Sequence, residues 1–194
     1  MESIEKFDYK GYQIRIEQDE TDYSPDESGD DGLFLVAFHS DFSVHRDGFE
    51  IGVCRSLLVD EGQSDEDIQR AKEVSKEYHV FELEAYIHSG VVLALSQEGN
   101  FPDRQWDVSR CGLVFASKKA YKSKTKAREA ARLLIRDWNH CLGGECYGFV
   151  VEKEKTCKTC GHTEYEFVDS CGGFLGETEA CIASAKDTVD GLVK

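Results

Sequence analysis

One stretch in the second half of the chain constrains the fold more than any other. From about Thr125 to Leu142, apolar side chains recur every three or four residues, which places them on one face of an α-helix. Gly143 and Gly144 follow directly and are typical of a helix end. An apolar face of this width has to be buried against another layer of secondary structure. The face consists of Ala127, Ala130, Ala131, Leu134, Ile135, Trp138, Cys141 and Leu142.

That other layer is predicted to be a β-sheet. Several short stretches alternate between apolar and polar residues, and others are short apolar runs, as expected of half-buried and buried strands. The turn residues Ser89 and Gly90 lie between two of these stretches and indicate a hairpin. The predicted strands cover residues 12–17, 32–38, 80–86, 91–95, 111–116, 147–153 and 164–168.

The remaining helices are shorter. Ser64 precedes three acidic residues, which predicts a capped helix from there to about Tyr78. A weaker pattern predicts a C-terminal helix over residues 178–190, and residues 49–59 fit a helix or a strand. Because strands and helices do not alternate as in βαβ units, we expect an α+β fold in a single domain over residues 1–194. Its antiparallel sheet should carry one long amphipathic helix and shorter helices packed on one face.

The charge of the chain is unevenly distributed. Residues 1–113 contain 26 Asp+Glu and 10 Lys+Arg, a net charge of −16, whereas residues 114–194 contain 12 and 13, a net charge of +1. The excess is concentrated in an acidic loop, residues 17–31, which has eight carboxylates and no base. A surface of one sign repels nucleic acid and attracts basic proteins or cations. The candidate partner-binding residues are Glu17, Asp19, Glu20, Asp22, Asp26, Glu27, Asp30 and Asp31, with Asp60, Glu61, Asp65, Glu66 and Asp67 as a second cluster.

The composition also limits where the protein is expected to work. Hydrophobic residues make up 40% of the chain, enough for a folded core despite the charge. No apolar stretch approaches the roughly 20 residues that cross a bilayer, and the N-terminus lacks the layout of a signal peptide. We therefore expect a cytoplasmic protein with no membrane partner. In that compartment its eight cysteines should be reduced thiols or metal ligands.

Several short segments occur in an order that resembles a known family. In that family a His-Ser-Gly turn is followed by Trp-Asp-Ser-Gly, and a tight hairpin ends in Asp-Ser-Cys. The matching segments of this chain are Gly11 to Glu20, His88-Ser89-Gly90, Trp106 to Gly112, Gly144 to Phe149 and Asp169-Ser170-Cys171. The matches spread over about residues 9–176, and by them the chain is similar to a family of small phage-encoded proteins of unassigned function. The resemblance implies a mobile-element origin and, by analogy, an action against host defence.

The chain departs from this family at three places. Ile87 stands where the family has a carboxylate before the histidine. Arg110 and an extra residue interrupt the Trp-Asp-Ser-Gly pattern. Residues 155–163 form an insertion at the tip of the hairpin that the family pattern lacks.

The hairpin-tip insertion contains the most specific metal-binding motif of the chain. Two thiolates spaced as Cys157 and Cys160 on one turn can bind the same zinc ion. His162 is the candidate third ligand. The alternative is an exposed thiol pair without a metal, and zinc is the only cofactor that the sequence suggests.

Two further cysteines would complete a zinc site by number alone. Cys141 and Cys146 together with the tip motif give C-x4-C and C-x2-C. A hairpin centred near residues 158–159, however, places Cys146 opposite Cys171, many residues along the strands from the tip. We therefore expect Cys146 and Cys171 to be neighbouring packed thiols, and the tip to lack these ligands.

A second constellation is a candidate catalytic site. His88 and Asp107, with a nearby serine such as Ser89 or Ser109, provide the residue types of a base and a nucleophile. The alternative is a hairpin turn next to His88 and a core position for Trp106. The sequence contains no Gly-x-Ser-x-Gly motif and no phosphate-binding loop. It therefore favours a protein that is not an enzyme.

Basic residues gather on and before the predicted long helix, where eight of the chain's 23 lie within 19 residues. Three interpretations are open: a solvated helix face, a surface that meets the acidic half of a second copy in a homodimer, and a patch for nucleic acid. The net charge of −15 and the lack of an aromatic platform argue against direct nucleic-acid binding. The run consists of Lys118, Lys119, Lys122, Lys124, Lys126, Arg128, Arg132 and Arg136.

As a whole the sequence favours a binding protein. The acidic loop does not fit the register of a calcium-binding EF-hand. Carboxylates along a strand and loop can instead replace phosphates and compete for the arginines and lysines of a DNA-binding protein. We predict a phage-type acidic protein that inhibits a host nucleic-acid-handling defence complex, of the CRISPR or restriction type, by electrostatic occlusion or DNA mimicry. The alternatives are a small hydrolase-like enzyme using His88 and Asp107, and a zinc-stabilised structural or adaptor protein.

Overall fold

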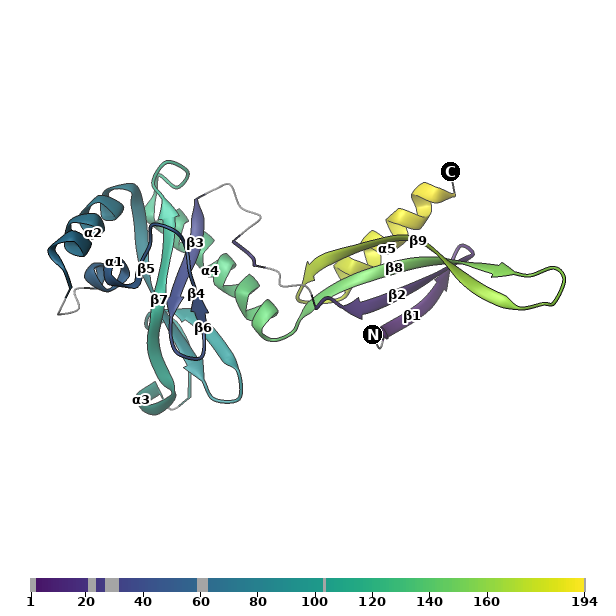
Figure 1. Ribbon diagram of the computed structural model, residues 1–194, viewed down its shortest axis with the longest axis horizontal. Coiled ribbons are helices and arrows are strands. Elements are labelled where there is room, and N and C mark those ends of the chain that lie inside the picture. The colour runs from purple at the N-terminus through teal and green to yellow at the C-terminus, as the bar shows by residue number, and fades with distance from the viewer. Residues whose placement is uncertain (1–2, 21–23, 27–31, 59–62, 103, 194) are drawn as a thin grey trace. The chain divides into compact units, whose positions relative to one another are not determined.

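A computed structural model describes residues 3–20, 24–26, 32–58, 63–102 and 104–193. The sequence predicts a single domain, whereas the contacts divide the chain into two compact units (Figure 1). Unit 1 combines Met1–Tyr23 with Gly144–Lys194, and unit 2 is Ser24–Gly143. The α+β class with antiparallel sheets and one long helix is confirmed.

Unit 2 is built on a five-stranded antiparallel sheet with the order β4-β3-β7-β5-β6. The predicted hairpin at residues 80–95 is confirmed, because β5 and β6 pair with Ile87 opposite Val91. β7 lies at the centre, since its apolar residues are buried on both faces. The strands are β3 (Leu33–Phe38), β4 (Ser43–Val44), β5 (Tyr78–Ile87), β6 (Val91–Leu95) and β7 (Val108–Ser117).

Helices cover both faces of this sheet, where the sequence predicts one covered face. The long helix α4 (Lys124–Leu142) packs against the face that carries Leu35 and Ala37 of β3. The opposite face, with Phe34 and Val36, packs against α1 and α2. Successive strand residues point to opposite faces, so the uninterrupted apolar run of β3 contributes side chains to two hydrophobic cores, one on each face. The other helices of unit 2 are α1 (Ile51–Leu57), α2 (Asp65–Glu77) and the short α3 (Arg104–Asp107).

Polar side chains fix the two longer helices of unit 2. Ser64 caps α2 as predicted, since its hydroxyl oxygen accepts a hydrogen bond of 3.1 Å from the Asp67 amide. Asn139 ties α4 to the edge strand β6: its amide oxygen accepts from the Leu93 amide at 2.7 Å, and its nitrogen donates to the Leu93 carbonyl at 3.0 Å. The orientation of α4 over the sheet is therefore set by directional bonds as well as by apolar packing.

Unit 1 is a four-stranded antiparallel sheet covered on one face by a helix. The strand order is β1-β2-β8-β9. Ile14 and Ile16 of β2 are fully buried against α5, while the alternate residues Gln13 and Arg15 belong to the opposite face of the sheet. The elements are β1 (Ser3–Tyr9), β2 (Tyr12–Gln18), β8 (Cys146–Thr156), β9 (Thr163–Leu175) and α5 (Glu179–Leu192).

The pairing of β8 with β9 corrects the predicted cysteine neighbours. Cys146 lies opposite Leu175, and Cys171 lies opposite Phe149. The register shifts twice, between Tyr147 and Phe149 and again next to Val151, with the extra residue on β9 each time. The offset of Cys146 from Cys171 has two causes: the turn is centred between Thr159 and Cys160, one residue later than expected, and the two bulges add the rest. Among the described residues, no helix is long and apolar enough to cross a membrane.

Candidate functional site

The face of the unit 1 sheet opposite α5 brings together polar residues from all four strands. The register aligns Asp8 with Gln13, Gln13 with Glu152, and Glu152 with Phe167. Two residues further along β8, Glu154 lies opposite Tyr165. Phe167 is 62% exposed and Tyr165 is 45% exposed. The open face therefore combines carboxylates with two solvent-accessible aromatic rings, the residue types of a binding surface with aromatic anchors.

A small cavity of about 210 Å³ lies on this face. Its lining includes the carboxylates of Asp8 and Glu154, the ring of Tyr165 and the amide side chain of Gln13. Gln13 is only 8% exposed, and its Oε1 atom has no hydrogen-bond partner among the described residues. A buried carbonyl oxygen without a donor is unfavourable by about 1–3 kcal/mol. We call this cavity the Gln13 pocket; it is lined by Asp8, Gly11, Tyr12, Gln13, Glu154 and Tyr165.

The basic side chains near the Gln13 pocket, Arg15 and Lys6, already contact other residues of unit 1. Arg15 donates to Glu152 through Nε and Nη2, both at 3.2 Å, and to Glu17 through Nη1 at 2.6 Å. The Lys6 ammonium lies 5.2 Å from the centre of the Tyr165 ring. That contact shows that the ring attracts cations, as expected from its quadrupole. The pocket itself presents acceptors and an aromatic face, and no positively charged residue lines it.

The residues predicted to form an acidic docking face are in different environments. Glu17 pairs with Arg15, and a carboxylate oxygen of Asp19 accepts from the Gly173 amide at 2.8 Å. Glu20 is exposed. Asp26 is a correction: it is 5% exposed and accepts hydrogen bonds from the Trp138 indole and from the Leu35 amide. Its carboxylate is therefore bonded in the interior of unit 2 and is not accessible to a partner.

The second acidic cluster belongs to unit 2, at the start of α2. Asp65 and Glu66 are exposed, and Asp67 accepts a hydrogen bond from the Ser64 hydroxyl at 2.7 Å. Carboxylates in the first turn of a helix interact favourably with the helix dipole, so these three residues stabilise α2. The remaining predicted partner-binding residues, Asp22, Glu27, Asp30, Asp31, Asp60 and Glu61, lie outside the described residues.

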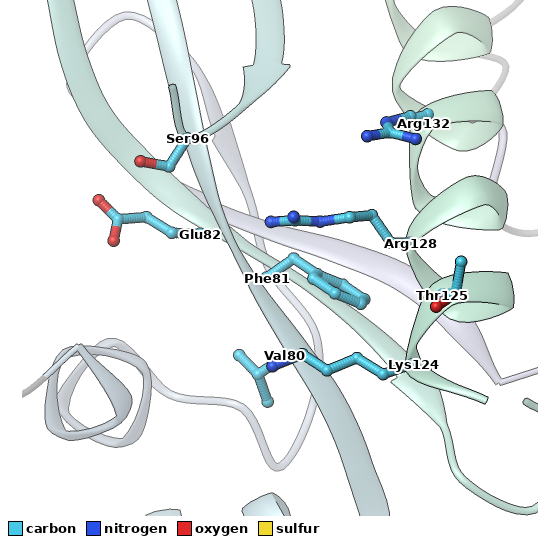
Figure 2. Close-up of a pocket in the computed structure, with 8 residues that line it drawn as sticks. All are labelled: Val80, Phe81, Glu82, Ser96, Lys124, Thr125, Arg128 and Arg132. Carbon is cyan, nitrogen blue, oxygen red and sulfur yellow. The ribbon is translucent and has the colours of Figure 1, made fainter. Parts of the chain in front are cut away.

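The basic run of α4 lines a larger cavity, of about 510 Å³ (Figure 2). Figure 2 shows Arg128 and Arg132 projecting from the helix toward the strand that carries Glu82. Both guanidinium groups pair with Glu98, at 3.4 Å and 2.7 Å. The hydrogen bond from Arg132 holds the pKa of Glu98 below its usual value. Glu98 therefore compensates one of the two positive charges, and both arginine side chains stay about half exposed, at 46% and 54%, as on a solvated helix face.

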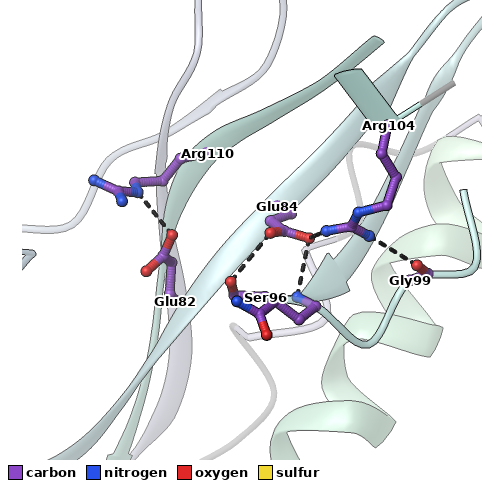
Figure 3. A network of polar contacts seen from close by, with 7 residues as sticks. Glu82, Glu84, Ser96, Gly99, Arg104 and Arg110 are labelled. Atoms are coloured by element: carbon purple, nitrogen blue, oxygen red, sulfur yellow. Dashed lines mark hydrogen bonds and ion pairs between the residues drawn. The ribbon is translucent and has the colours of Figure 1, made fainter. Parts of the chain in front are cut away.

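A second polar network surrounds Glu82 and Glu84 of β5 in the same sheet (Figure 3). Arg104 donates to Glu84 at 2.6 Å and to the Gly99 carbonyl at 2.8 Å, while the Ser96 hydroxyl donates to Glu84 at 3.1 Å. Partial burial raises the pKa of Glu84, but these bonds outweigh it, and the net shift is downward. Arg110, one of the departures from the family pattern, donates to Glu82 at 2.7 Å. This network ties the segment after β6 to the sheet.

The structure brings the candidate catalytic pair His88 and Asp107 together. Nδ1 of His88 and Oδ2 of Asp107 are 3.8 Å apart, which suits an ion pair with a protonated histidine but is too long for a hydrogen bond. The His88 side chain is 70% exposed, and its ring stacks on Tyr86 at 6.2 Å. The predicted core position of Trp106 is wrong, because its side chain is 81% exposed. The short helix α3 presents Trp106 to solvent beside Asp107.

The hairpin tip holds its two cysteines on an ordered, exposed turn. The Gly161 amide donates to the Cys157 carbonyl at 2.9 Å, and the Cys157 amide donates to the His162 carbonyl at 2.7 Å. Hydrogen bonds from the backbone amides of Cys160 and Thr159 lower the pKa of the Cys157 thiol to about 7. Within the described ranges no three His, Cys, Asp or Glu side chains group closely enough to hold a metal.

No protein-family model, curated protein or solved structure matches this chain. Its function has to be inferred from the arrangement of its own residues. The alternation of residues 12–17 already placed Gln13 and Arg15 on one polar face, but no local pattern in the sequence indicated that Asp8, Glu154 and Tyr165 lie beside Gln13.

Proposed function

We propose that the protein is an acidic, non-catalytic binding protein whose unit 1 captures cationic side chains of a basic partner. The observation that carries this proposal is the Gln13 pocket, where an unpartnered buried acceptor adjoins two carboxylates and an aromatic ring. An arginine guanidinium has five donors and no acceptor, so it is complementary to such a lining. Binding would give Gln13 Oε1 the donor it lacks and place the cation against Tyr165.

The charge of unit 1 supports the same partner class. Its residues, 1–23 and 144–194, contain 17 Asp+Glu and 8 Lys+Arg, a net charge of −9. Such a potential accelerates the approach of a basic protein and makes its association sensitive to salt. Phe167, next to Glu152 on the open face, supplies apolar contact area. Charge would then steer the partner, and the pocket and the aromatic rings would hold it.

The resemblance to phage-encoded proteins suggests which basic partner this is. We propose that the target is a nucleic-acid-handling complex of host defence, of the CRISPR or restriction type, acting in the host cytoplasm. Such complexes hold nucleic acid through arginines and lysines that contact phosphates. Carboxylates that occupy those side chains block the nucleic acid by occlusion, one inhibitor for one target, with no chemical turnover.

The first prediction concerns the carboxylates of the pocket. The double variant Asp8→Asn, Glu154→Gln keeps the shape of both side chains but removes both charges. Charge-assisted hydrogen bonds contribute about 1.5–3 kcal/mol each, so we expect the affinity for a fluorescent ten-arginine peptide to fall at least tenfold. Fluorescence anisotropy at 100 mM NaCl measures this loss.

A charge-matched control separates the pocket from the net charge. Glu177→Gln, Asp187→Asn removes the same charge from two exposed carboxylates of unit 1 that do not line the pocket. We expect this variant to lose less than about threefold, as screened surface charges do. If both variants lowered the affinity for the peptide equally, binding would depend on net charge alone and the pocket would have no special role.

A second candidate function, a hydrolase-like activity, is favoured only by the approach of His88 to Asp107. A general base contributes about 10²–10⁴-fold to a rate. On this reading His88→Ala slows hydrolysis of p-nitrophenyl acetate at least 100-fold, whereas His45→Ala, an exposed histidine elsewhere in unit 2, leaves it unchanged. Equal rates for the wild type and His88→Ala would remove this candidate.

A further inference from the structure

The hairpin of β8 and β9 extends beyond the rest of the unit 1 sheet. The last residue of β8 that pairs with β2 is Lys153, opposite Tyr12. Beyond it, β8 and β9 continue as a two-stranded ribbon to the pair Thr156 and Thr163 (Figure 1). Four residues of strand from Lys153 to Cys157 span about 13 Å. The turn with the two cysteines therefore lies at the free end of a projecting ribbon.

That turn is arranged as half of a zinc site. Cys157 and Cys160 are both exposed, and the turn between them is closed by the bond from Gly161 to the Cys157 carbonyl. Gly161 has φ +70°, a left-handed conformation that glycine adopts without strain. Two cysteines separated by two residues have the ligand spacing of structural zinc sites.

The ligand count of this site is incomplete within one chain. A structural zinc ion takes four ligands, usually thiolates or imidazoles in a tetrahedron. The turn supplies two thiols, and the described part of the chain offers no group of three candidate ligands. Cys54, Cys111, Cys146 and Cys181 are buried in the interiors of the two units. Because the turn is exposed, a second molecule can supply the two missing ligands.

We propose that two copies of this chain join at their hairpin tips through one zinc ion, held by Cys157 and Cys160 of each copy. A two-fold axis through the metal makes the same turn serve both sides, as in most homodimers. Binding releases the remaining thiol protons to solvent and changes no oxidation state. Four thiolates and one Zn²⁺ carry a net charge of −2, and the exposed Lys158 of each copy offsets it.

The projecting ribbon makes a contact between two hairpin tips compatible with the net negative charge of the chain. Two copies of net charge −15 repel each other. The Debye length at physiological salt is about 8 Å, less than the roughly 13 Å that the ribbon places between the tip and the four-stranded part of the sheet. Contact at the tips therefore avoids most of the repulsion that a contact between the sheets would meet.

The test is zinc titration of the full-length protein, reduced with a phosphine and freed of metal by chelation. We expect one zinc ion for every two chains and a light-scattering mass that rises from 21.9 kDa to twice that value, reversed by chelator. Cobalt in place of zinc should give the absorption bands of a tetrahedral four-thiolate site, also at one ion for two chains. One ion bound to each monomer, no binding at micromolar metal, or a dimer that forms without metal contradicts the proposal.

Matched variants assign the ligands. Cys157→Ser, Cys160→Ser should abolish both metal binding and dimerisation. Cys171→Ser, which removes an exposed cysteine of the same hairpin, and His162→Ala should retain both. Loss of the dimer in Cys171→Ser or His162→Ala would show that the ligand set is wrong. The result is independent of the Gln13 pocket, because the peptide-binding variants leave the tip cysteines unchanged.

Discussion

Replacing Gly112 with alanine is expected to destabilise unit 2 more than any other single-methyl change that the structure suggests. A Cβ atom at this position would lie 2.1 Å from the Val36 carbonyl oxygen and 2.8 Å from the Ala37 Cα atom. Both atoms belong to the backbone of the neighbouring strand β3, so no side-chain rotation can relieve the overlap. Overpacking typically costs about 1–3 kcal/mol and more where the backbone must move. We expect at least about 3 kcal/mol here.

Both tryptophans of the chain, Trp106 and Trp138, lie in unit 2, so their fluorescence reports its unfolding. For a unit of this size about 3 kcal/mol lowers the midpoint of thermal unfolding by roughly 10 °C or more. Gly90→Ala is the matched control, because a Cβ atom at that turn meets no atom within 4 Å. A midpoint for Gly112→Ala within a few degrees of the control would contradict the close packing of β7 against β3.

The second large effect is expected at Asp26. Its carboxylate accepts hydrogen bonds from the Trp138 indole and from the Leu35 amide, and so links α4 to β3 in the interior of unit 2. Asp26→Ala leaves two buried donors without this acceptor, at about 1–3 kcal/mol each. We expect a loss of roughly 3 kcal/mol in the free energy of unfolding, measured by urea denaturation with circular dichroism.

Two further variants show whether the acceptor or the charge matters. Asp26→Asn keeps the shape and one acceptor oxygen, so it should be less harmful than Asp26→Ala. Asp47→Ala, an exposed carboxylate of the same unit, should change stability by less than about 0.5 kcal/mol. Equal stability of Asp26→Ala and Asp47→Ala would mean that the buried carboxylate is not holding α4 to the sheet.

The elements with strong local patterns were predictable from the sequence. The apolar spacing from Ala127 to Trp138 specified α4, because each of these residues meets the same core. The order Ser64, then three acids, specified the start of α2 through the capping bond and the helix dipole. In both cases the forces that form the element act between residues a few positions apart.

Features that depend on distant residues were not predictable in this way. The burial of Asp26 depends on Trp138, 112 positions along the chain, so its carboxylate looked like one more member of the acidic loop. The offset between Cys146 and Cys171 depends on the exact centre of the turn and on two bulges, and no local residue pattern indicates either of them. Trp106 was expected in the core because tryptophans usually are mostly buried, but α3 presents it to solvent.

The candidate site falls between these two cases. The alternation of β2 placed Gln13 on the polar face, but the lining of its pocket comes from residues as far apart as Asp8 and Tyr165. Only the strand order β1-β2-β8-β9 brings them together. The sequence therefore predicted that carboxylates would attract a basic partner, and the structure supplies a particular pocket for its side chain.

The central claim is that the Gln13 pocket binds a cationic side chain, and nuclear magnetic resonance tests it most directly. An arginine-rich peptide is titrated into ¹⁵N-labelled protein, and the same peptide with citrulline in place of every arginine is the neutral control. The account predicts saturable shifts of the Gln13 side-chain amide and of the backbone amides of Asp8, Glu154 and Tyr165 with arginine, and none with citrulline. Shifts spread over exposed carboxylates elsewhere, with these four residues unaffected, would contradict it.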